Sequence, residues 1–148
     1  MKLYFDVCCL NRPFDDQTQS RIRMESEAVL LILDRVERGE CEMVGSDVAN
    51  FEIRRIPDPV RRRRVEILFG ASAQRVALDD AIVERAAVIE RLGIGGLDAL
   101  HVACAERGAV DVMLTTDDRL LRAAARGADG LGVRVENPVQ FLVEEAWT

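Results

Sequence analysis

Apolar residues follow two different spacings along this chain. In four short segments they lie side by side, at residues 2–6, 41–45, 110–115 and near 132–136. Short apolar runs bounded by acidic or glycine residues are typical of buried strands. The sequence therefore predicts four strands, and residues 72–80 form a further short extended connection.

In the longer segments, apolar residues recur every three or four positions, as on one face of a helix. This spacing predicts helices over residues 18–38, just after Asp47, from Pro59 to Gly70, over 81–92, from about Asp98, over 118–126, and from Pro138 to about Trp147. Residues 7–16 are expected to form a loop in which Asp15 and Asp16 cap the following helix. Further cap candidates are Ser46 or Asp47, and Asp79 or Asp80.

Strands and helices alternate along the chain, without internal repeats or a low-complexity linker. A chain of 148 residues is long enough to bury roughly two-thirds of its extended surface. Such alternation is typical of a parallel sheet with helices on both faces. We therefore predict one domain over residues 1–148, a three-layer α/β/α sandwich with a central, mainly parallel sheet of four to five strands.

The composition narrows the function classes. Charged residues make up 31% of the chain and the net charge is −6, which disfavours a protein that simply coats nucleic acid. A nuclease remains compatible, because metal-binding acids themselves add negative charge. No apolar run is long enough to cross a bilayer, and neither a signal peptide nor a disulfide pattern is evident. We expect a cytoplasmic protein with reduced cysteines.

Acidic residues stand where predicted strands end or helices begin. Asp6 ends the first strand, Glu52 follows the second, and Asp98 starts a helix. Asp117 and Asp118 follow the third strand. Each acid by itself could simply cap a turn or a helix. In a parallel sheet, however, the carboxyl ends of the strands share one edge, and this is where open α/β folds bind ligands.

Carboxylates gathered at one edge repel one another strongly unless a cation lies among them. Because the chain has no Cys or His at metal-ligand spacing, the oxygen donors favour Mg²⁺ or Mn²⁺ over Zn²⁺. A divalent cation of this kind supports the hydrolysis of phosphodiesters. The acids therefore predict a magnesium or manganese site and a nuclease activity.

The same residues carry a resemblance to a known family. The segments SDVANFE, GLDALHVACAE and TTDDRLL, after an opening strand that ends in an acid, resemble the PIN-domain nucleases. The similarity is greatest to the VapC-like toxins of toxin–antitoxin pairs, covers residues 2 to about 138, and is most specific at DALHVACA. The resemblance implies a metal site formed by Asp6, Glu52, Asp98 and Asp117.

Two positions leave alternatives open. A Thr-x-Asp motif fits at both Asp117 and Asp118. We prefer Asp117 as the metal ligand, which leaves Asp118 to cap the helix. The family commonly has Thr or Ser after the first acid, where this chain has Val7, so a different small polar group must support Asp6. Thr115 and Asp118 are further candidates for contact with the substrate or with the metal ligands.

Other polar residues are candidates for secondary roles. His101 lies one helical turn after Asp98, on the same face. We favour a hydrogen-bonding role for it over that of general base, because the metal supplies the base. Asn11 and Arg12, in the predicted loop, are candidates for phosphate contact. The basic segment 54–64, which includes four consecutive arginines, fits a solvated helix face, an RNA contact or an acidic partner.

A metal-dependent endoribonuclease is the leading functional hypothesis. The resemblance implies the toxin of a toxin–antitoxin pair, which forms a homodimer and is neutralised by a cognate antitoxin protein. The alternative is a catalytically inactive PIN-like module that binds RNA or protein. A phosphoryl-accepting receiver domain also places acids at strand ends, but it needs a lysine late in the chain, and the only lysine here is Lys2.

Overall fold

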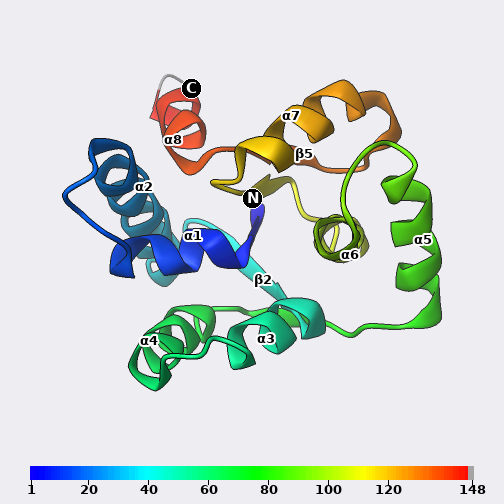
Figure 1. The fold of residues 1–148 in the computed structure, drawn as a ribbon. Helices are drawn as coiled ribbons and strands as arrows, with labels where there is room; N and C mark the ends of the chain where they lie inside the picture. Colours follow the sequence, from blue (N-terminus) through cyan, green and yellow to red (C-terminus); the bar gives the residue numbers. More distant parts are fainter. Residues whose placement is uncertain (147–148) are drawn as a thin grey trace.

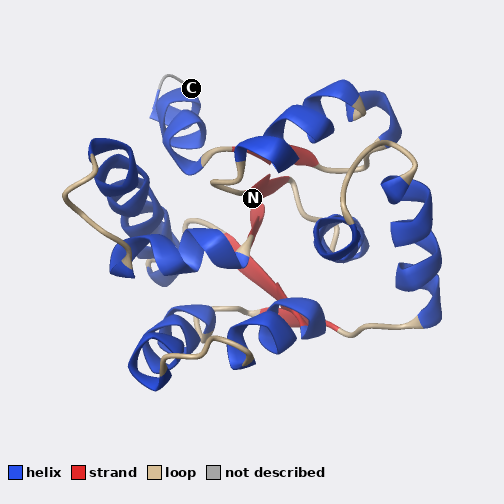
Figure 2. Cartoon of the chain, viewed as in Figure 1, coloured by secondary structure: helices blue, strands red, loops and turns tan. Residues whose placement is uncertain are grey.

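The computed structural model describes residues 1–146 and contains one five-stranded sheet. The strands lie in the order β3-β2-β1-β4-β5, and each neighbouring pair is parallel. They are β1 (Lys2–Phe5), β2 (Glu42–Ser46), β3 (Gln74–Val76), β4 (Val112–Leu114) and β5 (Arg134–Glu136). The predicted parallel sheet is confirmed, with part of the extended connection as its edge strand β3 and with β1 at its centre (Figure 2).

Helices cover both faces of this sheet, which confirms the three-layer prediction (Figure 1). In chain order the helical segments are α1 (Val7–Asn11), the 3-10 turn η1 (Arg12–Phe14), α2 (Ser20–Glu37), α3 (Asp47–Arg54), α4 (Pro59–Phe69), α5 (Asp80–Glu90), α6 (Gly96–Arg107), α7 (Asp118–Arg126), the 3-10 turn η2 (Ala128–Gly130) and α8 (Pro138–Ala146). The predicted end of the last helix near Trp147 lies outside the described residues. None of these helices combines the length and apolarity needed to span a membrane.

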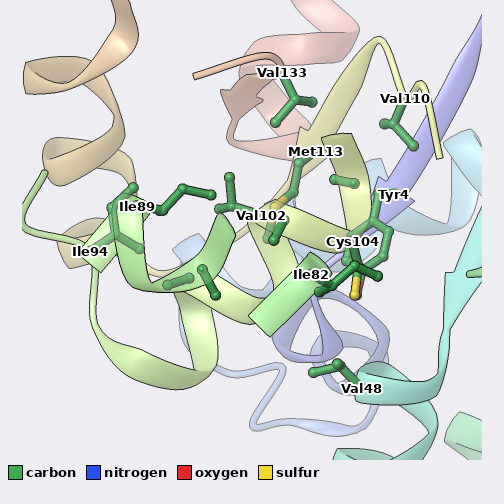
Figure 3. Packing of buried hydrophobic residues seen from close by; sticks show 14 of the residues in the cluster. Tyr4, Val48, Ile82, Ile89, Ile94, Val102, Cys104, Val110, Met113 and Val133 are labelled. Carbon is green, nitrogen blue, oxygen red and sulfur yellow. The ribbon is translucent and has the colours of Figure 1, made fainter. Parts of the chain in front are cut away.

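The central strand shows why two cores form. Successive side chains of a strand point to opposite faces of the sheet. Tyr4 therefore packs with Met113 and Val102 under α5, α6 and α7 (Figure 3). Leu3 and Phe5 belong to a second cluster, under α2, α4 and α8. A strand that is buried on both faces needs apolar residues at every position, which explains the continuous apolar run in β1.

The loop expected at residues 7–16 is wrong, because this segment contains α1 and η1. The sequence VCCLN has low intrinsic helix propensity, and a helix this short is unstable by itself. It forms because Val7, Cys9 and Leu10 are buried in the second cluster. Tertiary packing thus overrides the local preference for a loop.

The helix caps agree with the sequence in part. Ser46 caps α3 and Asp79 caps α5, each by accepting a hydrogen bond from a first-turn N–H. The cap of α2 by Asp15 or Asp16 is wrong, because α2 begins too far along the chain for either side chain to reach it. Asp16 instead accepts hydrogen bonds from the backbone N–H and the hydroxyl of Thr18.

A buried carboxylate on α2 joins the segments around the sheet. Glu25 is 2% exposed and accepts hydrogen bonds from Arg12 Nε (2.9 Å), Arg21 Nε (3.2 Å) and Asn137 Nδ2 (2.6 Å). These partners lie in η1, in α2 itself and directly before α8. Since Arg21 also forms a bidentate ion pair with Asp118 at the start of α7, Glu25 connects the α2 side of the molecule to α7.

We therefore expect Glu25→Ala to lower the free energy of unfolding by about 3 kcal/mol, because it leaves partly buried cations and an amide without their acceptor. Urea unfolding with an unchanged m-value measures this difference. Glu27→Ala, on the exposed side of the same helix, is the matched control and changes stability by about 0.5 kcal/mol or less. Equal losses in the two variants would show that the Glu25 contacts do not stabilise the fold.

Candidate metal centre

The first acid lies where the chain changes direction across the sheet. From β1 the chain continues to β2 on one side, whereas β4 joins later on the other side, and this arrangement is a topological switch point. Because Phe5 pairs with Leu114, the next residues of the two strands, Asp6 and Thr115, leave the sheet side by side. Asp6 is only 5% exposed, and its backbone N–H bonds to the carbonyl of Leu114 (2.9 Å).

Two neighbouring side chains hold the Asp6 carboxylate in place. The Thr115 hydroxyl donates a hydrogen bond to Asp6 Oδ2 (2.8 Å) and accepts one from the backbone N–H of Asp117 (3.1 Å). The Cys8 thiol lies 3.3 Å from the same oxygen of Asp6. The polar support that Val7 cannot give therefore comes from β4 and from the first turn of α1.

A histidine joins the predicted acids at this edge. One potential ligand atom each from Asp6, Glu52 and His101 lies within 4.8 Å of the others. Glu52 comes from α3, which follows β2, and His101 from α6, which packs against α3. Spacing along the sequence did not point to this histidine, because the fold brings together residues that are far apart in the chain.

His101 is completely buried. Its Nδ1 lies 2.6 Å from the Tyr4 hydroxyl. Its Nε2 lies 3.5 Å from Glu52 Oε2 but makes no hydrogen bond to any described residue. Burial by itself lowers the pKa of His101, but the carboxylates of Glu52 and Asp6 outweigh that effect and raise the pKa above its usual value.

Asp98 and Asp117 lie beside this set of three rather than inside it. Both line a hollow of about 490 Å³ between the start of α6 and α7, which we call the α6–α7 hollow. Burial first, and then the charges of Asp6 and Asp117, raise the pKa of Asp98 to about 6. Asp6 and Asp117 are therefore close enough to disfavour the ionisation of Asp98.

Asp117, and not Asp118, caps α7. Asp117 Oδ1 accepts hydrogen bonds from the N–H groups of Arg119 (2.9 Å) and Leu120 (3.4 Å). Asp118 is exposed and bound to Arg21, which lowers the pKa of its carboxyl. The assignment of the cap to Asp118 is wrong, because two adjacent acids give the same sequence pattern and only the first helical residue distinguishes them.

The residues present fit a divalent cation. Carboxylate oxygens of Asp6 and Glu52 are near enough to share one ion, and the raised pKa of Asp98 marks excess negative charge at this edge. Oxygen donors of this kind suit Mg²⁺ and Mn²⁺. Asp6, Glu52 and Asp98 could hold the ion directly, with Asp117 at the rim of the hollow.

The residues expected to contact phosphate are occupied within the chain. Arg12 is bound to Glu25 and Asp15. Asn11 donates to the Val7 carbonyl and accepts from Arg61. The structure therefore does not turn either side chain toward the α6–α7 hollow.

The four consecutive arginines of α4 are divided between inward and outward contacts. Arg61 bonds to Asp15 and to the Phe14 carbonyl, and Arg62 bonds to the Ile56 carbonyl. Arg63 and Arg64 are exposed. Two of the four arginines are therefore used within the fold, and two remain on the surface.

Three other arginines were missed. Arg119, Arg122 and Arg126 line the α6–α7 hollow beside Asp98 and Asp117. All three are exposed, and none forms an ion pair with another residue in the described part of the chain. Their spacing of three and four residues was visible in the sequence, since such positions share one helix face. The position of that face beside the acids required the structure.

Comparisons with known proteins agree with this architecture. A chain in the crystal structure of VapBC2 from Rickettsia felis, bound to a DNA fragment from their promoter, has a similar fold, with a TM-score of 0.59 and 11% sequence identity. The similarity covers 93% of this chain and 98% of that chain. No curated protein sequence matched the chain.

A family comparison is more direct than this structural likeness. The profile described as "PIN domain" matches residues 6–126, which is most of the chain. The matched segment begins at Asp6 and contains Glu52, Asp98 and Asp117, so it includes the whole acidic cluster. With its parallel sheet and the acids at its carboxyl edge, the chain belongs to the PIN domain family.

Proposed function

We propose that this protein is a metal-dependent endoribonuclease that hydrolyses RNA phosphodiester bonds. The observation that carries the proposal is the convergence of Asp6, Glu52, Asp98 and Asp117 on one edge of the sheet. Four carboxylates in such proximity are costly unless they serve to bind a cation. Membership of the PIN domain family supports the same reaction class.

In this proposal each side chain has a defined task. Asp6 and Glu52 bind Mg²⁺ or Mn²⁺, and Asp98 adds a further negative charge that attracts the ion. Thr115 fixes the Asp6 carboxylate and, through the Asp117 N–H, the start of α7. Such an ion, when bound, stabilises the negative charge of the transition state and lowers the pKa of water. Hydrolysis adds the oxygen of water to phosphorus, breaks one P–O bond, and leaves a proton on the departing ribose oxygen.

The α6–α7 hollow is the proposed path of the RNA backbone. The guanidinium groups of Arg119, Arg122 and Arg126 form no ion pair with an acid in the described part of the chain. Guanidinium groups bind phosphate in a bidentate manner. Because Asp98 and Asp117 line the same hollow, phosphates on the arginines would bring a neighbouring phosphodiester to the acids.

We further propose that the protein is the toxin of a toxin–antitoxin pair, a single domain over residues 1–148, cytoplasmic and homodimeric. The fold shared with a chain of the VapBC2 structure supports an antitoxin partner. Phe51 on α3 and Val60 and Ile67 on α4 are exposed apolar side chains, and α4 also carries the exposed Arg63 and Arg64. An apolar and basic surface of this kind suits contact with another protein.

RNA cleavage is the first test of the nuclease proposal. Purified protein, freed of any copurified inhibitor, is incubated with mixed cellular RNA in Mg²⁺, Mn²⁺ or EDTA. We expect cleavage with either metal and none in EDTA. Asp98→Asn should slow cleavage at least about a hundredfold, because about 2.7 kcal/mol of transition-state stabilisation is lost with the carboxylate.

Asp118→Asn is the matched control, since it changes the adjacent exposed acid and should leave cleavage within about twofold of wild type. A loss in Asp118→Asn without a loss in Asp117→Asn would reverse the assignment of the last acid. The absence of cleavage by folded, inhibitor-free wild type in every metal would favour the catalytically inactive binding module.

The raised pKa of Asp98 predicts that the stability of the metal-free protein depends on pH. The pKa of Asp98 is raised in the folded state to about 6, so the folded chain binds this proton more tightly than the unfolded chain does. Stability is therefore lost as the pH rises from about 4 to about 6 and stays reduced above that range. In EDTA at about pH 7.5, Asp98→Asn should be more stable than wild type by about 1 kcal/mol, a value discounted for the half-exposed position of Asp98.

Thermal unfolding of both proteins at about pH 4 and about pH 7.5 measures this difference, which should disappear at the lower pH. Mn²⁺ should raise the melting temperature of wild type more than that of Asp98→Asn. A variant less stable than wild type at both pH values would show that Asp98 has a structural role.

The proposed RNA path predicts a change in binding. In an Asp98→Asn background, replacing Arg119, Arg122 and Arg126 by Gln should weaken binding of single-stranded RNA at least about tenfold at low salt. It should also reduce the slope of log affinity against log salt by about 2, because three phosphate contacts are lost.

The matched control replaces Arg23, Arg63 and Arg75, which are exposed on other elements, and changes the net charge by the same amount. Fluorescence anisotropy over a salt series compares the two triple variants. Equal losses would indicate a general effect of net charge and would contradict a path along the α6–α7 hollow.

A further inference from the structure

His101 is the one nitrogen ligand candidate at the acidic edge. It lies on α6, one turn after Asp98, with its side chain completely buried. Its nearest polar neighbours are Tyr4 on one side of the ring and Glu52 on the other. A site built only of carboxylates leaves the position of this ring unexplained.

The Nε2 atom of His101 has no hydrogen-bond partner among the described residues. Buried polar atoms are nearly always paired, and leaving one unpaired costs free energy. Glu52 Oε2 is 3.5 Å away, which is within ion-pair range but too long for a strong hydrogen bond. The imidazole nevertheless faces two carboxylates. One ligand atom each of His101, Asp6 and Glu52 lies within 4.8 Å of the other two.

The hydrogen bonds on the other side of the ring allow Nε2 to carry a lone pair. The Tyr4 hydroxyl lies 2.6 Å from His101 Nδ1 and 2.7 Å from Ser46 Oγ. When Tyr4 donates to Ser46, it accepts from a protonated Nδ1, and Nε2 is then unprotonated. Histidine ligands of metals characteristically donate their second nitrogen to such a partner.

The separation of His101 Nε2 and Glu52 Oε2 suits two ligands of one ion. Two ligand atoms that are each about 2.1 Å from one ion lie roughly 3.0 to 3.5 Å apart in octahedral or tetrahedral geometry. The 3.5 Å between His101 Nε2 and Glu52 Oε2 falls at this separation. A cation placed between Nε2 and the two carboxylates would be a shared partner for all three groups.

We propose that His101 Nε2 is a direct ligand of the metal centre, together with Asp6 and Glu52, and that it makes the centre select Mn²⁺ over Mg²⁺. Imidazole suits first-row transition metals, whereas Mg²⁺ prefers an all-oxygen environment. The inference deepens the proposed function and rests on it, since the ion is that of the nuclease site. Tyr4 and Ser46 are then positioning residues for the imidazole.

Pulsed electron paramagnetic resonance of the Mn²⁺-loaded protein tests the inference without measuring activity. A nitrogen bound directly to Mn²⁺ gives a ¹⁴N hyperfine signal, which we expect in wild type. His101→Asn keeps an amide nitrogen near the position of Nδ1, facing Tyr4, but removes Nε2. We expect this variant to lose the signal and to bind Mn²⁺ at least about tenfold more weakly, with Mg²⁺ affinity changed by less than about threefold.

Tyr4→Phe is the matched control because it removes the hydroxyl and keeps the imidazole. The nitrogen signal should persist in Tyr4→Phe, and Mn²⁺ affinity should fall about tenfold through loss of ring orientation. Circular dichroism checks the fold of both variants. If His101→Asn does not fold, the signals of wild type and Tyr4→Phe decide the question.

The outcomes separate the two proposals. Stoichiometric Mn²⁺ binding without a ¹⁴N signal in wild type would overturn His101 as a ligand and leave the metal-dependent nuclease intact. An unchanged ratio of Mn²⁺ to Mg²⁺ affinity in folded His101→Asn would overturn the selectivity. No binding of either ion to wild type would overturn the metal centre itself, and with it both proposals.

Discussion

The parallel pairing of β1 with β4 is the constraint on which the site depends. It places Asp6 and Thr115 side by side at the point where both strands leave the sheet. The Thr115 hydroxyl then connects the first acid to the start of α7 through the Asp117 N–H. A shift of one residue in this register would turn these side chains to opposite faces and separate the acids.

The acids at this edge conflict with the stability of the fold. Asp6 is almost completely buried, and the ionised form of Asp98 is disfavoured by burial and by its neighbours. The apolar clusters on the two faces of the sheet and the hydrogen bonds of Glu25 offset this cost elsewhere. Stability and chemistry are therefore carried by different parts of the molecule, as expected when a site needs charges that a core avoids.

The charge distribution explains how an acidic chain could bind RNA. The net charge of −6 is an average, and three arginines of α7 gather on one wall of the α6–α7 hollow without acidic partners in the described chain. Other arginines, including Arg12 and Arg61, are bound to acids and stabilise the fold. Local arrangement, rather than net charge, decides where phosphate can bind.

The sequence by itself determined the layered fold and the acids at strand ends, because apolar periodicity and residue order are local properties that a parallel sheet converts directly into position. It could not determine that residues 7–14 are helical, which follows from burial against distant segments. Nor could it choose Asp117 over Asp118 as the cap, since both fit one motif and only the helix start separates them.

The place of His101 beside Glu52 was decided by the packing of α6 on α3, a contact between residues 49 positions apart (101 − 52). Such long-range contacts depend on how whole elements dock, which no local pattern records.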